Sequence, residues 1–159
     1  MATTGTYVTY LTYLGGPRMV DGVTVHFDSY TEARAHFKDL LDAADRGRVA
    51  TVRRDNRSTA VVDVERLRYF MATVCPSNAQ VVAEGDGWSA FIPGLPVAAD
   101  GATFDEAINE MIDALREYAE DWQERLLDAP NHANNWGLVQ FVGLSTDEQL
   151  RVWLVGRPQ

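Results

Sequence analysis

Two stretches of the sequence, residues 29–47 and 103–127, carry the signals that begin and sustain an α-helix, and short strand-like runs flank both. In the first stretch Ser29 and Glu32 form a capping box, and Gly47 marks the end of the helix. A helix with one apolar stripe must bury that stripe against a sheet or another helix. Because strand-like runs surround each helix, the sequence predicts an α+β fold made of two small units.

The first unit is expected to span residues 23–74, with a strand, a helix, a hairpin and a second helix in that order. Residues 23–27 have the composition of a short strand, and two further strand-like runs meet at a turn-rich tip, residues 55–57. Asp63 is expected to cap the second helix, which ends before Pro76. The predicted apolar stripe of the first helix consists of Ala33, Phe37, Leu40, Leu41 and Ala44.

This order of elements, and the residues within it, resemble the N-terminal module of the prevent-host-death (Phd)/YefM antitoxin family. The tip differs, because the family usually has a glycine there and this chain has Asp55-Asn56-Arg57-Ser58. Asn56 tolerates a left-handed backbone and is expected to stand in for the glycine. The residues that carry the resemblance are Ser29 to Arg34, Leu40-Leu41, Thr51 to Arg54, Thr59 to Val62, and Leu67, Tyr69 and Phe70.

In that family two chains pair through this module and present basic residues to operator DNA. The resemblance therefore implies a homodimer, with Arg34 and either Arg53 or Arg54 as DNA contacts. The residues themselves favour the same positions, because Arg34 lies off the buried stripe on a predicted first helical turn, where free N–H groups favour phosphate.

Arg53, Arg54 and Arg57 stand close together at the predicted hairpin tip. A guanidinium binds phosphate or a guanine edge through two hydrogen bonds, so Arg57 joins the predicted DNA contacts. The alternative is that these arginines only solvate the hairpin or pair with acids such as Asp55.

The net charge of −9 is unevenly distributed along the chain. Residues 23–77 hold nine basic and eight acidic side chains, whereas residues 78–159 hold four basic and fourteen acidic ones. The first part is therefore compatible with a polyanion such as DNA, and the second suits a partner with a basic surface. The alternative for the second part is that its acids serve only solubility.

The second unit is expected to span residues 78–159, after a linker at residues 75–78. Two strands joined by a glycine-rich turn precede the long acidic helix, residues 136–143 are predicted to be a strand, and Ser145 with Glu148 is predicted to cap a final helix. Trp136, Phe141, Trp153 and Leu154 are predicted to belong to the core, and the alternative is that they anchor a protein interface. The apolar stripe of the long helix consists of Phe104, Ile108, Met111, Ile112, Leu115, Tyr118, Ala119, Trp122 and Leu126.

Part of this unit resembles the HicB antitoxin fold, in which a small sheet packs on one helix. In HicB proteins a DNA-binding part commonly follows this domain, whereas the basic module precedes it here, so the resemblance does not name the toxin. The residues that carry the resemblance are Gly87-Trp88, Phe91 to Pro96, and Gly101 to Glu106 with the acidic helix that follows.

The two resemblances together imply a cytoplasmic antitoxin of a type II toxin–antitoxin system, which neutralises a toxin by direct binding and represses its own operon. Because Phd/YefM modules usually accompany RelE-like ribonucleases or Doc-like enzymes, a RelE-like toxin is favoured over a Doc-like or HicA-like one. A toxin that cleaves RNA presents a basic surface, which an acidic domain can cover. The sequence assigns no toxin-binding residue.

Two other classes of function are compatible with the sequence. A transcriptional repressor with a small-molecule-sensing C-terminal domain would need a concave pocket around Trp88 and Phe91. A degenerate RNase H-like enzyme derived from the HicB-type fold would need converging acids that hold a metal ion.

The sequence points to no catalyst, metal or cofactor. His26, His36 and His132 are the only histidines, and no two have the spacing of metal ligands. Nucleophile and phosphate-loop motifs are absent, and the single cysteine, Cys75, excludes an intrachain disulfide.

Residues 1–22 are expected to be an N-terminal extension, in which residues 6–14 alternate like an edge strand. The beginning of the chain has no secretion signal, and no window approaches the roughly 18 apolar residues of a membrane helix. These features predict a cytoplasmic protein that does not enter a membrane.

Overall fold

The computed structural model describes residues 18–20 and 24–156 and divides the chain into two compact units, Met1–Asp63 and Val64–Gln159. Both units combine a small sheet with helices, which confirms the predicted α+β class. Residues 6–14, predicted to be an edge strand, lie outside the described residues. Of the expected extension at 1–22, only the strand β1 (Arg18–Val20) is described.

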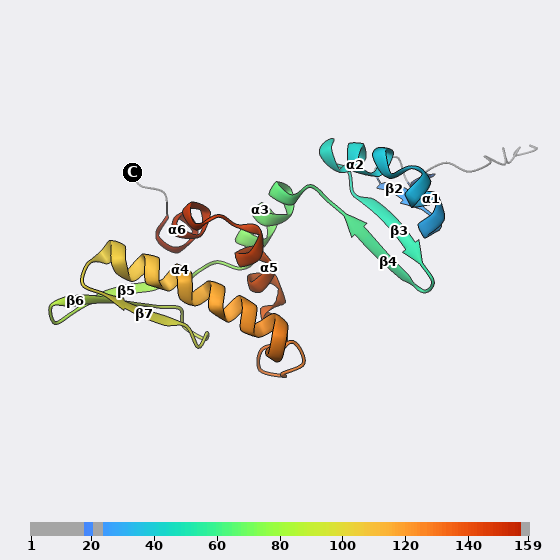
Figure 1. Ribbon diagram of the computed structural model, residues 1–159. Coiled ribbons are helices and arrows are strands. Elements are labelled where there is room, and N and C mark those ends of the chain that lie inside the picture. Colours follow the sequence, from blue (N-terminus) through green and yellow to red (C-terminus); the bar gives the residue numbers. More distant parts are fainter. Residues whose placement is uncertain (1–17, 21–23, 157–159) are drawn as a thin grey trace, which may run out of the picture. The chain divides into compact units, whose positions relative to one another are not determined.

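The first unit is a four-stranded sheet with two helices on one face (Figure 1). The sheet order is β1-β2-β3-β4, with β2 and β3 parallel and the two outer pairs antiparallel. The other elements are β2 (Thr24–Phe27), α1 (Tyr30–Ala35), α2 (Phe37–Asp45), β3 (Ala50–Arg54) and β4 (Arg57–Val61). The buried core between helices and sheet consists of Val25, Phe27, Ala33, Leu40, Ala43 and Ala50, with Val52 and Val61 packed against it.

The predicted first helix is divided in two at His36, whose φ of −116° and ψ of 33° are not helical. Its predicted beginning is confirmed, because the Ser29 hydroxyl accepts a hydrogen bond from the Glu32 N–H. The break restarts the helical phase, so that Phe37 and Leu41 remain 58% and 43% exposed. Their assignment to the buried stripe was therefore wrong, whereas Ala33, Leu40 and Ala44 are buried as predicted.

The hairpin turn between β3 and β4 consists of Asp55 and Asn56, because Arg54 pairs directly with Arg57. The residue with a left-handed backbone is Asp55, at φ 53°, and not Asn56 as predicted. Aspartate tolerates this region almost as well as asparagine does, so either residue replaces the family's glycine.

The helix α3 (Val64–Val74) is grouped with the second unit, where its buried Met71 packs against α5 (Trp136–Leu144). This helix was expected at the end of the first module, residues 23–74. The division at residues 63 and 64 therefore lies one helix earlier than the expected boundary.

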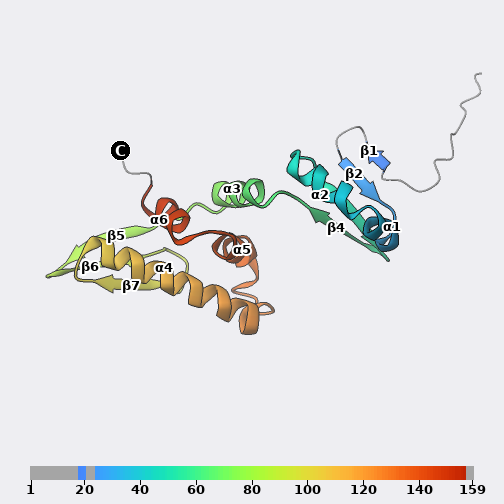
Figure 2. The ribbon, with the colours of Figure 1, turned by 45° about the horizontal axis from the view of Figure 1, so that its top comes forward.

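The second unit is built on a three-stranded antiparallel sheet in the order β5 (Gln80–Glu84), β6 (Gly87–Phe91) and β7 (Ala98–Gly101). The long helix α4 (Phe104–Asp121) packs on β6 and β7 and continues as a π-helical turn, Trp122–Leu126 (Figure 2). The predicted stripe of α4 is buried from Ile108 to Trp122. A small sheet on one long helix is therefore the observed arrangement.

Gly101 is a point of close approach between β7 and α4. A Cβ atom at this position would lie 2.3 Å from the backbone nitrogen of Ala107. Since real atoms do not approach so closely, only glycine allows the helix to lie on the strand here.

Residues 136–143, predicted to be a strand, belong to the helix α5. Leu138, Val139, Phe141 and Val142 are all buried, because α5 packs against both α3 and α4. A helix that is apolar on nearly every side has the composition of a buried strand, and periodicity alone does not separate the two.

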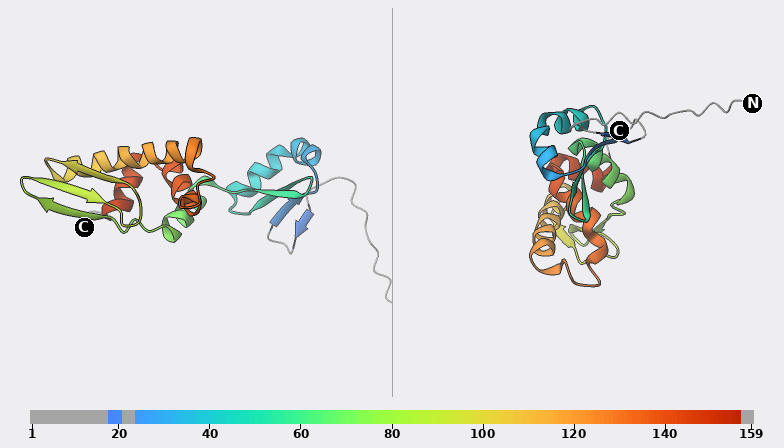
Figure 3. Two further views of the ribbon diagram at one scale, coloured as in Figure 1. Left: turned by 90° about the horizontal axis from the view of Figure 1, so that it is seen from below. Right: turned by 90° about the vertical axis from the view of Figure 1, so that its right-hand side faces the viewer.

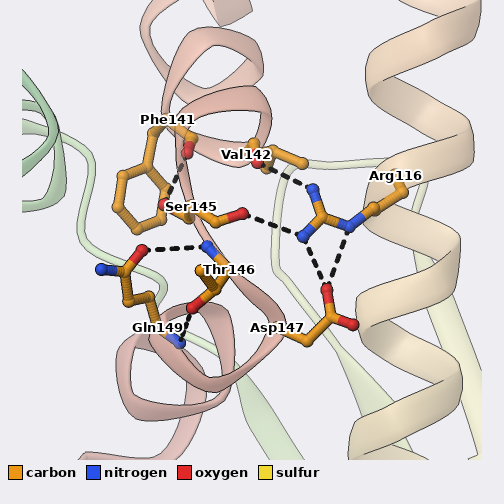
Figure 4. Close-up of polar contacts among 7 residues, drawn as sticks. All are labelled: Arg116, Phe141, Val142, Ser145, Thr146, Asp147 and Gln149. Atoms are coloured by element: carbon orange, nitrogen blue, oxygen red, sulfur yellow. Dashed lines mark hydrogen bonds and ion pairs between the residues drawn. The ribbon is translucent and has the colours of Figure 1, made fainter. Parts of the chain in front are cut away.

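The final helix α6 (Asp147–Val155) is present as predicted, but its cap lies one residue later. The Thr146 hydroxyl accepts from the Gln149 N–H, and the Gln149 side chain accepts from the Thr146 N–H (Figure 4). The Ser145 hydroxyl, which was predicted to cap this helix, donates instead to the Phe141 carbonyl at 2.7 Å.

Candidate functional site

The strands β3 and β4 hold three of the four predicted DNA-contacting arginines, and their register decides which of these share a face. Arg54 and Arg57 are cross-strand neighbours on the face that also carries Val52, toward the helices. Arg53 lies next to Ser58 on the opposite face. The structure therefore brings Arg54 and Arg57 together and separates Arg53 from them.

A hollow at the hairpin tip is lined by Arg54, Asp55, Asn56, Arg57 and Thr59. The side chains of Arg54 and Arg57 are exposed and form no hydrogen bond or ion pair with any other described residue. Like charges directly opposite one another in a sheet repel, and a bound anion removes that repulsion. The tip is therefore electrostatically suited to an anionic group such as a phosphate.

Arg34 lies in α1, at the end of the sheet where the hairpin turns (Figures 1 and 2). It is exposed and, like the hairpin arginines, has no polar partner among the described residues. However, α1 has only six residues, and Arg34 lies in its last turn and not in its first. The expected support from free N–H groups is therefore missing, because the Ser29 hydroxyl and the carboxylate of Glu32 act at the other end of the helix.

Lys38, in the same unit, differs from these arginines because its charge has an acidic partner within the chain. Its ammonium group donates to the Asp42 carboxylate at 2.5 Å, which raises the pKa of Lys38 and lowers the pKa of Asp42. Because its charge is partly balanced, Lys38 is less suited to an added anion than the unpaired arginines are.

An apolar surface on α1 and α2 was missed by the sequence analysis. Tyr30, Phe37 and Leu41 are 61%, 58% and 43% exposed, and they occupy positions i, i+7 and i+11. Phe37 and Leu41 are four residues apart in α2 and share one face of that helix, whereas Tyr30 begins α1 on the other side of the break at His36. Exposed apolar neighbours such as Phe37 and Leu41 are candidates for contact with another protein chain.

The acidic residues of the second unit gather along the exposed side of α4. We call five of them the α4 acidic stripe; their spacings of three and four residues place them on one face, away from the sheet. No ion pair joins them to a described lysine or arginine. The stripe consists of Glu110, Asp113, Glu117, Glu120 and Glu124.

All three histidines have polar partners. His26 contacts Thr51 Oγ1 at 2.7 Å and Asp28 at 3.3 Å, and His36 contacts Asp39 at 3.2 Å. His132 Nδ1 lies 2.9 Å from the hydroxyl of Tyr118. In the described part of the chain, no cluster of three histidine, cysteine or acidic side chains has the geometry to hold a metal ion.

The four large apolar residues that were predicted to form the core differ in their burial. Phe141 and Leu154 are buried, and the half-buried Trp153 packs on Phe141 and donates from Nε1 to the Cys75 carbonyl at 2.8 Å. Trp136, in contrast, is 54% exposed.

None of the helices in residues 24–156 combines the length and apolarity needed to cross a membrane.

A sequence-family model, PHD-like, described as an antitoxin of RelE/RelB toxin–antitoxin systems, matches residues 25–140. Because that match covers most of the chain and extends over both units, the protein belongs to the PHD-like antitoxin family.

A crystal structure has a similar fold. It is described as the antitoxin part of a proposed toxin/antitoxin system from Syntrophomonas wolfei subsp. wolfei, and it superposes with a TM-score of 0.68 at 20% sequence identity. The similarity covers 82% of this chain and 94% of that chain. No curated protein matches this chain in sequence.

Proposed function

We propose that this antitoxin neutralises a RelE-like ribonuclease by direct binding and represses its own operon by binding operator DNA. The observation that carries the proposal is the family match over residues 25–140, together with the concentration of the chain's negative charge in the second unit. The first unit is the DNA-binding module, of Phd/YefM type. The second is the toxin-binding domain, of HicB-like type, and the protein acts in the cytoplasm.

The DNA contacts are assigned to Arg34, Arg53, Arg54 and Arg57. Their unpaired guanidinium groups support this assignment, because a cation without an internal partner gains most from a phosphate. Arg54 and Arg57 together form the phosphate clamp, since they line one hollow. Arg53, on the other face of the hairpin, contacts a different part of the duplex.

The first unit acts as a homodimer. Tyr30, Phe37 and Leu41 support this, because their exposed apolar surface is of the kind that a second copy covers. A pair of modules doubles the number of phosphate contacts, and it lets a two-fold symmetric protein read two half-sites.

The second unit attracts the toxin electrostatically. A ribonuclease must carry a basic surface to bind RNA, and the α4 acidic stripe offers that surface a row of carboxylates without internal cations. Such long-range attraction mainly raises the rate of association. The protein is not an enzyme in this account, and it needs no metal or cofactor.

The alternative, a C-terminal domain that senses a small molecule, receives less support from the geometry. Trp88 stacks edge-on against Phe104, with ring centres 5.5 Å apart, and the hollow beside it is lined largely by carboxylates and backbone. Phe91 does not line that hollow. An apolar ligand would therefore find few of the walls that such pockets usually have.

The DNA assignment is tested by gel-shift titration on the protein's own promoter. We expect the Arg34/Arg53/Arg54/Arg57 quadruple alanine variant to lose binding, whereas Arg46→Ala, which removes an exposed charge outside the group, retains most of it. Unchanged affinity in the quadruple variant would remove the site assignment. Loss of binding in Arg46→Ala alone would show that the assigned group is the wrong one.

A further inference from the structure

The sheet of the second unit has one covered face and one open face. On β6, Trp88 and Ala90 pack into the core beneath α4. Because side chains alternate along a strand, Ser89 and Phe91 lie on the opposite face. No helix within residues 64–156 covers that face, which the left panel of Figure 3 shows from below. We call it the open sheet face.

The centre of the open sheet face is apolar. Val82 of β5 pairs with Ser89, so its side chain lies on the same face as that of Phe91. Val82 and Phe91 are both half-buried, and neither is among the side chains that pack against the buried core of this unit. Their apolar surface is therefore left for a partner.

One end of the open sheet face is hollowed, because Gly87 has no side chain there. The register places Gly87 opposite Glu84 of β5, and it places Asp100 of β7 opposite Ser89. The hollow is lined by Glu84, Asp86, Ser89 and Asp100 together with Gly87, Trp88, Gly101 and Ala102.

The carboxylates around this hollow lack a positive partner. The Ser89 hydroxyl lies 2.6 Å from Asp100 Oδ1 and 3.2 Å from Glu84 Oε2, but it has only one proton to donate. None of the described lysines or arginines forms an ion pair with Glu84, Asp86 or Asp100. Neighbouring charges of the same sign repel one another, so a cation from a partner would be stabilising here.

We propose that the open sheet face is the surface on which the antitoxin holds its toxin. A lysine or arginine of the toxin enters the hollow between Glu84 and Asp100, and an apolar side chain beside it covers Val82 and Phe91. The occupant is a basic protein because the face joins an apolar centre to uncompensated negative charge. The inference rests on the proposed function, which supplies a toxin with an RNA-binding surface.

The α4 acidic stripe has a different part in this arrangement. It is entirely charged and offers no apolar anchor, whereas residues that dominate binding energy lie in well-packed, desolvated contacts. We therefore assign attraction over a distance to the stripe, and the retention of the bound toxin to the open sheet face.

The test is a kinetic binding measurement on the full chain, with a catalytically inactive form of the protein encoded by the neighbouring reading frame as the probe. We expect Phe91→Ala to weaken binding by about tenfold to a hundredfold, almost wholly through faster dissociation. The Glu84→Gln/Asp100→Asn double variant keeps the shape of the hollow and removes its charge. It should weaken binding by about tenfold or more.

The matched control is the Glu110→Gln/Glu117→Gln/Glu124→Gln variant of the α4 acidic stripe. It should slow association and reduce the salt dependence, with a dissociation rate within about twofold of the wild type. Equal thermal unfolding of all variants, followed by tryptophan fluorescence, excludes loss of folding as the cause.

Three outcomes would overturn the inference, and they differ in what they say of the proposed function. Wild-type dissociation rates in both face variants would refute the docking face while the toxin-binding function stands. A change in the sedimentation of the chain alone in Phe91→Ala would assign the face to self-association. No binding of the probe by the wild type would refute the proposed function itself, and the docking face with it.

Discussion

Arg116 of α4 binds Asp147 at the beginning of α6, with 2.6 Å between Nη2 and Oδ1 (Figure 4). The same guanidinium donates to the carbonyls of Val142 and Ser145, at 3.1 and 2.9 Å. Both carbonyls stand at the end of α5, where the Val142 carbonyl also accepts from the Ser145 N–H. One half-buried side chain thus joins α4, α5 and α6.

We expect Arg116→Ala to destabilise the second unit by about 1–3 kcal/mol, because it leaves the Ser145 carbonyl without its donor, whereas the Val142 carbonyl keeps the Ser145 N–H. Asp147→Asn should cost about 1 kcal/mol or less, since Asp147 is 71% exposed. Urea unfolding followed by tryptophan fluorescence measures both, because Trp88, Trp122, Trp136 and Trp153 all lie in this unit. Equal costs for the two variants would contradict the role given to the carbonyls.

Gly101→Ala is expected to cost at least about 2 kcal/mol or to prevent folding of the second unit, since its Cβ would meet the Ala107 backbone. Gly143→Ala is the matched control, because this exposed residue of α5 has nothing within 4 Å of a new Cβ. It should stabilise α5 by about 0.5–1 kcal/mol. Differential scanning calorimetry compares the two, and a tolerated Gly101→Ala would refute the close approach of β7 and α4.

Substitution of Thr146 tests whether this residue, and not Ser145 as predicted, caps α6. Thr146→Ala should destabilise the second unit by about 1 kcal/mol, and Thr146→Ser should restore most of that loss because serine caps equally well. Chemical unfolding of the two variants gives the comparison. A full loss in Thr146→Ser would mean that the methyl group, and not the hydroxyl, matters at this position.

The register of the hairpin predicts unequal effects among the arginines. We expect Arg54→Ala/Arg57→Ala to lower the salt slope of DNA binding by about two, one for each lost phosphate contact. Arg53→Ala, on the other face, should lower it by no more than about one. Fluorescence anisotropy at several salt concentrations gives these slopes, and an equal slope for wild type and double variant is incompatible with a phosphate clamp.

Local signals in the sequence predicted the parts of the fold that local interactions decide. Ser29 was identified as a helix cap because its side chain can bond the residue three positions later, and the structure has that bond. The buried stripe of α4 was likewise predicted from the sequence, because a helix that packs on one sheet has its apolar residues at a regular helical spacing.

The wrong predictions concern residues whose structure depends on contacts with residues far away in the sequence. Residues 136–143 form a helix because α3 and α4 enclose them, and their apolar run does not reveal that enclosure. Phe37 and Leu41 face outward because the helix is interrupted at His36, and no glycine or proline in the sequence there indicates the interruption. The open sheet face was invisible for the same reason, since only the pairing of β5, β6 and β7 brings Glu84, Ser89 and Asp100 together.

The central claim is that this chain is an antitoxin whose partner is a toxin. Growth of a host that expresses the neighbouring reading frame, with and without the full chain, tests it most directly. We expect the neighbouring product alone to arrest growth and co-expression of the chain to restore it, with the two proteins recovered as one complex. Continued arrest despite soluble expression of both proteins, or a neighbouring product that is harmless alone, would contradict it.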